Sequence, residues 1–259
     1  MKITLHHICY GYEPHNQVIN EITGSFESGN FYSILGPNGS GKTTLLDLIS
    51  GFLTPDTGHI EINGRQISQF TKNQLSRQIA LVSQDYAINF PFQVKDVIMM
   101  GRHPYIPRFA LPSDNDIKIV ERMIDLCGIR HLMNRKINQL SGGERQRCVF
   151  ARALCQDTPV LLLDEAFSSM DIHHTLQMLN LVKQQVKETN KTVISVFHDL
   201  NLASVWSDKL MLLKQGQIYQ SGNSRDVLTR EAVKQVFNVN ALVTYNPDIH
   251  AKQVSYVSV

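Results

Sequence analysis

The stretch Gly36-Pro37-Asn38-Gly39-Ser40-Gly41-Lys42-Thr43-Thr44 decides the fold of this chain, because it matches the phosphate-binding pattern Gly-x-x-x-x-Gly-Lys-[Ser/Thr]. The sequence predicts a buried strand over residues 31–35 before it and a helix over residues 43–50 after it. Its three glycines let the backbone curl around a polyphosphate, and the helix dipole adds positive potential there. Lys42 is expected to neutralise the β- and γ-phosphates, and the Thr43 hydroxyl is expected to coordinate Mg²⁺.

The composition describes a globular chain with little net charge. Its 259 residues can bury roughly three quarters of the unfolded surface, and a formal net charge of +2 gives no general affinity for nucleic acid or acidic membranes. The four cysteines show no Cys-x-x-Cys pairing, so reduced thiols are expected rather than a disulfide framework or a metal site. No apolar run suits a signal peptide or a membrane span, so the sequence predicts a soluble protein of the reducing interior.

A continuous apolar run over residues 160–163 predicts a central parallel strand that is buried on both faces. The run ends in two carboxylates, Asp164 and Glu165. Neighbouring residues of a strand point to opposite sides unless the chain turns there, so the two side chains are expected to differ in role. Asp164 suits the outer shell of a metal ion, and Glu165 suits a general base that polarises water.

Two further predicted strands carry polar side chains at their carboxyl ends. Residues 79–82 form one apolar run, soon followed by Gln84, and residues 193–197 form another, followed by His198. Ligands of open α/β sheets bind at the carboxyl ends of the strands. His198 is therefore expected on the same edge as Lys42 and Glu165, and Gln84 is a further candidate.

Composition changes between residues 86 and 138, where prolines and aromatic residues break up the chain and helices are expected near residues 94–100 and 115–127. Such a segment predicts a helical lobe inserted into a parallel sheet. Its apolar residues suit either a groove that receives a helix of another protein, with Arg102 on the rim, or the core of the lobe itself. These residues are Tyr86, Phe90, Phe92, Tyr105 and Pro107.

The stretch Leu140-Ser141-Gly142-Gly143-Glu144-Arg145-Gln146-Arg147 is expected to begin the next helix, which runs to Leu154. Ser141 and Glu144 stand at the spacing of a capping box. Two glycines weaken a first helical turn, so they are expected where another group approaches closely. A helix N-terminus beside a hydroxyl is also a binding site for anions.

Smaller elements follow from local patterns. The Asn63-Gly64 pair predicts a hairpin turn, and the chain from residue 229 onward predicts a short helix and two strands. A packing stripe is expected on the helix in which four apolar residues recur at helical spacing, namely Ile172, Leu176, Leu179 and Val186.

The order of these motifs along the chain resembles that of the nucleotide-binding subunits of ATP-binding cassette (ABC) transporters. The resemblance runs from Tyr12 to about Gly222 and includes Ser169-Met170-Asp171. It implies an α/β P-loop NTPase fold with a RecA-like core, an antiparallel β subdomain and an inserted α-helical subdomain. The implied boundaries in this single ABC ATPase domain are residues 1–85 and 150–222 for the core with its β subdomain, 86–149 for the helical subdomain and 223–259 for a C-terminal extension.

The resemblance also implies roles for individual residues. Tyr12 looks like the aromatic residue that stacks on adenine, and Gln84 looks like the residue that touches Mg²⁺ and senses the membrane partner. Glu165 resembles the catalytic carboxylate, and His198 resembles the switch that contacts the γ-phosphate. The other implied ATP ligands are the phosphate loop of residues 36–44 and, from the opposite subunit, Ser141, Gly142, Gly143 and Gln146.

The chain departs from the family pattern at two places. Ala166-Phe167 stand where Pro-Thr is usual, and Met170 stands where Leu is usual. Neither change removes a charged or hydrogen-bonding group from the expected chemistry, although both bear on the local geometry of the loop.

A narrower resemblance, carried by residues 97–105 and 198–203, is to the ATPases of iron–siderophore, haem and cobalamin importers. It implies hydrolysis of ATP with Mg²⁺ between two copies of the chain, which bind integral membrane permease subunits at the cytoplasmic face of the membrane. A substrate-binding protein would deliver the cargo, and no nucleic acid partner is implied. A soluble cassette ATPase of iron–sulfur assembly and the ATPase subunit of an exporter are the alternatives.

Overall fold

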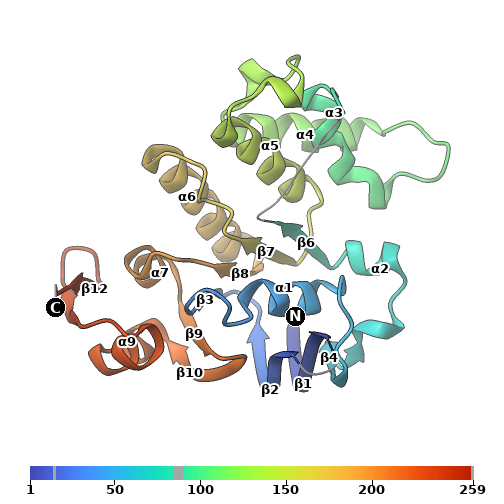
Figure 1. Ribbon diagram of the computed structural model, residues 1–259. Coiled ribbons are helices and arrows are strands. Elements are labelled where there is room, and N and C mark those ends of the chain that lie inside the picture. Colours follow the sequence, from blue (N-terminus) through green and yellow to red (C-terminus); the bar gives the residue numbers. More distant parts are fainter. Residues whose placement is uncertain (14–15, 84–89, 258–259) are drawn as a thin grey trace. The chain divides into compact units, whose positions relative to one another are not determined.

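The computed structural model describes residues 1–13, 16–83 and 90–257 (Figure 1). The chain forms two compact units. The first unit combines Met1–Gln69 with Thr192–Val259, and the second is Phe70–Lys191. Among the described residues, no helix combines the length and the apolarity needed to cross a membrane.

An antiparallel sheet in the first unit has the strand order β2-β1-β4-β5. The turn between β4 and β5 is formed by Asn63 and Gly64, both with positive φ (51° and 79°), which confirms the predicted hairpin. Along β1 and β4, apolar residues alternate with polar ones, so one face of this strand pair is buried and the other is partly exposed. The strands are β1 (Lys2–Glu13), β2 (Asn16–Glu27), β4 (Thr57–Ile62) and β5 (Arg65–Gln66).

The parallel strands of the first unit centre on β3 (Phe31–Leu35), which pairs in parallel with β8 (Thr192–Val196) and β9 (Lys209–Lys214). β10 (Gln217–Asn223) is antiparallel to β9. Every residue of β3 and of β8 is buried, so these strands show no alternation of apolar and charged residues.

Helices and a terminal hairpin complete the first unit. The predicted helix and two strands after residue 229 are confirmed as α9, β11 and β12. The Asn201 amide ties α7 to β12, because it donates to the Val254 carbonyl (3.2 Å) and accepts from the Val254 N–H (2.7 Å). The elements are α1 (Lys42–Ser50), η1 (Ile67–Gln69), α7 (Leu200–Trp206), α8 (Ser224–Val227), α9 (Arg230–Phe237), β11 (Ala241–Asn246) and β12 (Ala251–Tyr256).

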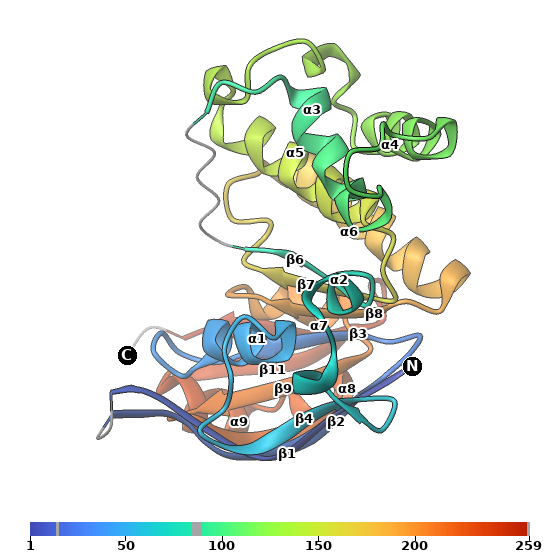
Figure 2. The same ribbon diagram turned by 90° about the vertical axis from the view of Figure 1, so that its right-hand side faces the viewer.

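The second unit contains a parallel strand pair and a helical lobe. β6 (Ile79–Val82) and β7 (Val160–Asp164) pair in parallel, and the helical segment lies between them in the sequence, as predicted. Within the lobe, α5 packs against α3 and α4 (Figure 2). The helices are α2 (Lys72–Ser76), α3 (Val94–Met99), η2 (Met100–Tyr105), α4 (Asp114–Leu126), η3 (Arg130–Leu132), η4 (Ile137–Gln139), α5 (Gly142–Cys155) and α6 (Ile172–Thr189).

The stripe expected on α6 is only half correct. Leu179 and Val186 are buried, but Ile172 is 65% exposed and Leu176 is also exposed. Helical spacing fixes the face on which a residue lies, but it does not fix how far along the helix neighbouring elements cover that face. The first turns of α6 therefore present apolar side chains that the sequence pattern assigned to the core.

Candidate functional site

The phosphate loop leaves the buried strand β3 and ends at the start of α1 in the first unit. Gly39 (φ 76°) and Gly41 (φ 95°) adopt left-handed conformations, which glycine reaches at little cost. Gly41 is the N-cap of α1, which starts at Lys42, one residue earlier than predicted. The loop therefore leads directly into a helix N-terminus, where backbone N–H groups lack partners within the helix.

Two loop glycines are required by close packing as well. A Cβ on Gly36 would lie 2.4 Å from the Leu213 carbonyl oxygen, and a Cβ on Gly41 would lie 3.0 Å from the Val18 carbonyl oxygen and 2.7 Å from the end of the Ile19 side chain. A Cβ on Gly39 would meet nothing within 4 Å, so this glycine is explained by its backbone angles and by the open space beside it.

Lys42 is held across the loop by the loop's own backbone. Its side chain is 6% exposed, and its Nζ donates to the carbonyl oxygens of Gly36 and Pro37, both at 2.9 Å. The Ser40 hydroxyl is buried and has no hydrogen-bond partner among the described residues. The Thr43 hydroxyl lies on an exposed residue of the first helical turn. A buried cation, an unpartnered hydroxyl and a helix N-terminus fit a polyphosphate, and the exposed hydroxyl fits its metal ion.

Tyr12 lies beside the beginning of α1 in the same unit. Its hydroxyl hydrogen-bonds the Thr44 hydroxyl at 3.2 Å, and its ring meets Tyr10 edge-on, with centroids 5.2 Å apart. The Tyr12 side chain is 59% exposed, so a face of the ring is available for stacking. The structure thus brings the predicted adenine-stacking residue to the phosphate loop.

His198 is exposed and follows β8, whose parallel neighbour β3 leads into the phosphate loop. The carboxyl ends of parallel strands lie at one edge of a sheet, so His198 and the loop start from adjacent strand ends of the first unit. Asp199 caps α7 by accepting hydrogen bonds from the N–H groups of Asn201 and Leu202.

Asp164 and Glu165 lie in the second unit, at the end of β7. Asp164 is the last residue of the strand and is buried. Glu165 adopts a left-handed conformation (φ 48°), which is uncommon for a residue with a side chain. The two carboxylates therefore differ in direction because the chain turns at Glu165. The unusual Phe167 that follows is buried against Phe150 of α5, with ring centroids 5.9 Å apart.

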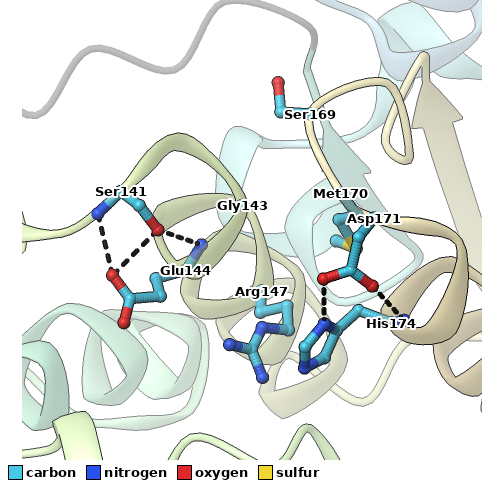
Figure 3. Close-up of a pocket in the computed structure, with 8 residues that line it drawn as sticks. All are labelled: Ser141, Gly143, Glu144, Arg147, Ser169, Met170, Asp171 and His174. Atoms are coloured by element: carbon cyan, nitrogen blue, oxygen red, sulfur yellow. Dashed lines mark hydrogen bonds and ion pairs between the residues drawn. The ribbon is translucent and has the colours of Figure 1, made fainter.

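The stretch around Ser141 forms the predicted capping box at the start of α5 (Figure 3). The Ser141 N–H and hydroxyl donate to the Glu144 carboxylate (2.8 and 2.9 Å), and the Glu144 N–H donates to the Ser141 hydroxyl (3.3 Å). These hydrogen bonds, the backbone one foremost, lower the pKa of the Glu144 carboxyl below its usual value. Gln146 lies on the same helix and is partly exposed.

An open pocket of 590 Å³ lies between the start of α5 and the loop before α6. Figure 3 shows Arg147 on α5 and His174 on α6, both of which line this pocket. Asp171 caps α6 by accepting from the His174 N–H (2.9 Å) and contacts His174 Nδ1 (2.8 Å), which lowers the pKa of the Asp171 carboxyl. The lining residues are Ser141, Gly143, Glu144, Arg147, Ser169, Met170, Asp171 and His174.

Sequence reasoning missed Arg147 and His174 as members of this pocket. Arg147 stands six residues after Ser141 and His174 stands three after Asp171, so each follows a capping residue on its helix. The only signal in the sequence was an ionisable residue close to the N-cap of each helix. That signal indicates a pocket only when the N-termini of the two helices are known to lie together.

The predicted residues divide between the two units. Tyr12, the phosphate loop and His198 belong to the first unit, whereas Ser141–Gly143, Gln146, Asp164 and Glu165 belong to the second. Gln84 lies outside the described residues, as does Tyr86.

The aromatic segment before α3 corrects one expectation. Arg102 is not a rim residue, because it is 5% exposed and donates to Asp116 (2.9 Å) and to the Cys155 carbonyl (2.7 Å). Its guanidinium lies 4.1 Å from the centre of the Tyr105 ring. Tyr105 is partly buried and therefore packs within the lobe against this guanidinium.

Two phenylalanines of this segment do face solvent. Phe90 is 69% and Phe92 is 41% exposed, and their ring centroids lie 5.9 Å apart. Of the described aromatic residues expected to form a groove, these two are the ones presented at the surface of the second unit.

Comparisons with known proteins point to one protein family. The sequence model of a family described as ABC transporter matches residues 19–168. The chain is 35% identical over 239 residues to the cobalamin import ATP-binding protein BtuD of Halobacterium salinarum, which covers 92% of this chain but 60% of that protein. It is 35% identical over 241 residues to the hemin import ATP-binding protein HmuV of Escherichia coli, which covers 91% of this chain and 92% of that protein. The chain thus spans about 60% of the length of the cobalamin import relative.

Solved structures show the same architecture. An ABC transporter of metal-chelate type in an inward-facing conformation aligns with a TM-score of 0.83 and 26% identity, over 99% of this chain and 97% of that one. A dimeric bacterial ABC transporter cassette aligns with a TM-score of 0.77 and 27% identity, over 86% of this chain and 99% of that one. With the phosphate loop, the capping box and the family match over residues 19–168 in agreement, the chain belongs to the ABC transporter family.

Proposed function

We propose that the chain is the ATP-hydrolysing subunit of a membrane importer for an iron–siderophore, haem or cobalamin. The phosphate loop carries this proposal: Lys42 bridges the Gly36 and Pro37 carbonyls at 2.9 Å beside the buried, unpartnered Ser40 hydroxyl. The cargo class is supported by the names of the relatives, which import cobalamin and hemin.

The phosphate loop would hold ATP through its backbone N–H groups and Lys42, while Tyr12 stacks on adenine. Thr43, with Asp164 and Gln84, would hold Mg²⁺, which supplies positive charge to the phosphates. The carbonyl oxygens of Gly36 and Pro37, which accept from Lys42 Nζ, hold the ammonium at the loop, where it would meet the phosphates.

Glu165 would orient and deprotonate the attacking water, and His198 would contact the γ-phosphate. The left-handed backbone of Glu165 supports its assignment, because strained conformations of non-glycine residues cluster at functional sites. Asp164, in the extended strand just before, would direct its side chain elsewhere and serve the metal ion.

A second copy of the chain would complete each site. Ser141, Gly142, Gly143 and Gln146 would approach the γ-phosphate bound by the opposite copy, where the N-terminus of α5 offers partial positive charge. The dimeric cassette among the structural relatives supports this arrangement.

The remaining assignments concern the whole assembly. We assign residues 1–85 and 150–222 to the catalytic core with its β subdomain, 86–149 to the helical subdomain and 223–259 to a C-terminal extension. The chain would lie at the cytoplasmic face of the membrane, bound to permease subunits that receive cargo from a substrate-binding protein. The exposed Phe90 and Phe92 would be apolar anchors for contact with a permease.

ATP turnover by the purified chain tests this function. Glu165→Gln should lower hydrolysis by about 10²-fold or more, the range for loss of a general base, while a fluorescent ATP analogue still binds. Lys42→Ala should lose nucleotide binding and hydrolysis together. Glu188→Gln, an exposed carboxylate on α6, is the matched control and should leave turnover unchanged. Near-normal hydrolysis by the Glu165 variant contradicts the proposed role of Glu165.

A further inference from the structure

The partly exposed face of the β1–β4 strand pair carries two histidines and a glutamate. His6 lies on β1, and His59 and Glu61 lie on β4, the neighbouring strand (Figure 1). His6 is paired directly with His59 across the strands, and Glu61 stands two residues beyond His59 on the same face. Leu5 and Ile60, which are neighbours of these residues in the two strands and pair with each other, are buried on the opposite face. The three polar side chains thus project together from a hydrogen-bonded sheet.

Their ligand atoms converge. His6 Nε2 lies 3.4 Å from Glu61 Oε2, and His59 Nε2 lies 3.2 Å from Glu61 Oε1. The two imidazole rings stack with centroids 4.5 Å apart and an interplanar angle of 17°. The ligand atoms of the three residues all lie within 4.8 Å of one another. The His6 Nε2 atom is buried and makes no hydrogen bond within the described part of the chain.

A backbone irregularity holds the two histidines in this position. His7 adopts a left-handed conformation (φ 45°), and the pairing of β1 with β4 shifts register between His6 and Cys9. Gly58, with φ 76°, lies so close that a Cβ there would meet the His6 carbonyl oxygen at 2.2 Å and the His7 carbonyl oxygen at 2.4 Å. Bulges of this kind re-aim side chains and are typical of functional positions in sheets.

The donor set is that of a transition-metal site. Two imidazole nitrogens with one carboxylate bind Zn²⁺ and related ions, whereas Mg²⁺ and Ca²⁺ prefer oxygen ligands throughout. With zinc–nitrogen distances of ~2.0–2.1 Å, neighbouring ligands of a tetrahedral ion lie roughly 3.3–3.4 Å apart. Each imidazole nitrogen lies near one oxygen of the Glu61 carboxylate, at 3.4 Å for His6 and 3.2 Å for His59, and a tilt of the stacked rings would bring the two nitrogens onto one ion.

We propose that His6, His59 and Glu61 form a binding site for a divalent transition-metal ion, separate from the Mg²⁺ proposed at the phosphate loop. The site requires neither ATP nor a second copy of the chain, so it stands independently of the proposed ATPase function. A bound ion would cross-link β1 to β4 and stabilise the antiparallel sheet of the first unit. The alternative is a carboxylate that bridges two imidazoles through protons alone.

The test is a Zn²⁺ titration of the full-length, untagged, nucleotide-free chain against a chromophoric chelator, with Mg²⁺ in excess. We expect one Zn²⁺ per chain and a rise in melting temperature with Zn²⁺. His59→Gln and Glu61→Gln should each weaken the affinity for Zn²⁺ by at least about tenfold. This is the smallest effect expected even for loss of a residue that only hydrogen-bonds a metal ligand. His131→Gln, an exposed histidine of η3 in the other unit, is the matched control and should change neither value.

Several results would overturn the proposal. These are the absence of bound Zn²⁺ in the unmodified chain, equal affinities for that chain and His59→Gln, or loss of binding in His131→Gln. If a histidine variant folds poorly, Zn²⁺ binding by the unmodified chain still tests the proposal. Co²⁺ bound in place of Zn²⁺ by imidazole and carboxylate ligands gives visible absorption bands, which should disappear when Zn²⁺ displaces the Co²⁺. If the spectrum remains that of free Co²⁺, the site is contradicted.

Discussion

A Cβ on Gly143 would lie 2.9 Å from the carbonyl oxygen of Ser169, so the first turn of α5 is in close contact with the loop before α6 (Figure 3). For its neighbour Gly142, the nearest atom to a built Cβ is the Ser169 Cβ, at an ordinary 3.9 Å. Only one of the two adjacent glycines is therefore required by packing. The position of the loop that carries Asp171 depends on that contact.

The two glycines give a matched pair of variants. Gly143→Ala should destabilise the protein by about 1–3 kcal/mol, the usual cost of overpacking, because the Ser169 backbone must move. Gly142→Ala should be neutral or stabilising by up to ~1 kcal/mol, since alanine favours a helix. Chemical denaturation of both variants checks this order. Equal stabilities would mean that the loop yields to the added methyl group.

The phosphate loop offers a second pair. Gly41→Ala combines a left-handed backbone with a contact of 2.7 Å to the Ile19 side chain, so it should lose stability and nucleotide binding together. Gly39→Ala, where a Cβ meets nothing within 4 Å, should lose only the roughly 1–2 kcal/mol of the left-handed conformation. Melting temperatures and binding of an ATP analogue measure the difference. A Gly39 variant as unstable as the Gly41 variant would contradict this account.

The buried pair of Arg102 and Asp116 predicts a stability that depends on pH. Hydrogen bonds from the Ser113 hydroxyl and from Arg102 lower the pKa of the Asp116 carboxyl. Because the pKa of this carboxyl is lower in the folded than in the unfolded protein, its ionisation stabilises the fold at pH values above the unfolded-state pKa of about 3.9. This stabilisation is lost as the pH falls through the folded-state pKa. Asp116→Asn should cost about 3–5 kcal/mol at neutral pH, because it leaves a buried cation unpaired.

In Asp116→Asn, the free energy of unfolding should also fall less between about pH 5 and pH 3 than in the unmodified chain, because the titrating carboxyl group is gone. Asp125→Asn breaks an exposed pair with Arg130 and is the control, expected to change stability far less than Asp116→Asn, because solvent screens an exposed ion pair. Urea unfolding across that pH range measures both. An Asp116 variant with the acid sensitivity of the unmodified chain would exclude this carboxyl as the cause.

Substitutions at the exposed Phe92 and at the partly buried Tyr105 distinguish an effect on permease docking from an effect on folding. Phe92→Glu should leave the melting temperature and ATP binding unchanged while it weakens co-purification with the permease subunits, because Phe92 is 41% exposed. Tyr105→Glu should lower the melting temperature, since its ring contacts the buried Arg102 at 4.1 Å. Intact transport and co-purification with Phe92→Glu would place the docking surface elsewhere.

The proposed shared site predicts that activity depends on association. Because Ser141 would complete the site of the opposite copy, specific ATPase activity should rise with protein concentration. Glu165→Gln with ATP and Mg²⁺ should accumulate dimers in sedimentation, whereas a double variant that adds Ser141→Arg should remain monomeric. Constant specific activity from monomers at every concentration argues against a shared site.

Features that depend on neighbouring residues in the chain were determined by the sequence alone. The phosphate loop of residues 36–44, the Asn63-Gly64 turn and the capping box of Ser141 and Glu144 each form within a few residues. Backbone angles and short-range hydrogen bonds decide such features, and both follow from residue type and spacing. The strand ends that carry the predicted catalytic residues were found for the same reason, because apolar runs mark buried strands.

Only the tertiary structure decided which side chains are covered and which distant residues meet. Arg102 has the sequence context of an exposed loop but is buried by Asp116, and Ile172 has the spacing of a core residue but is exposed. His6 and His59 become neighbours only when β1 pairs with β4. Burial and contact of this kind depend on segments far apart in the chain, and the free energy of their packing is not encoded in any local pattern.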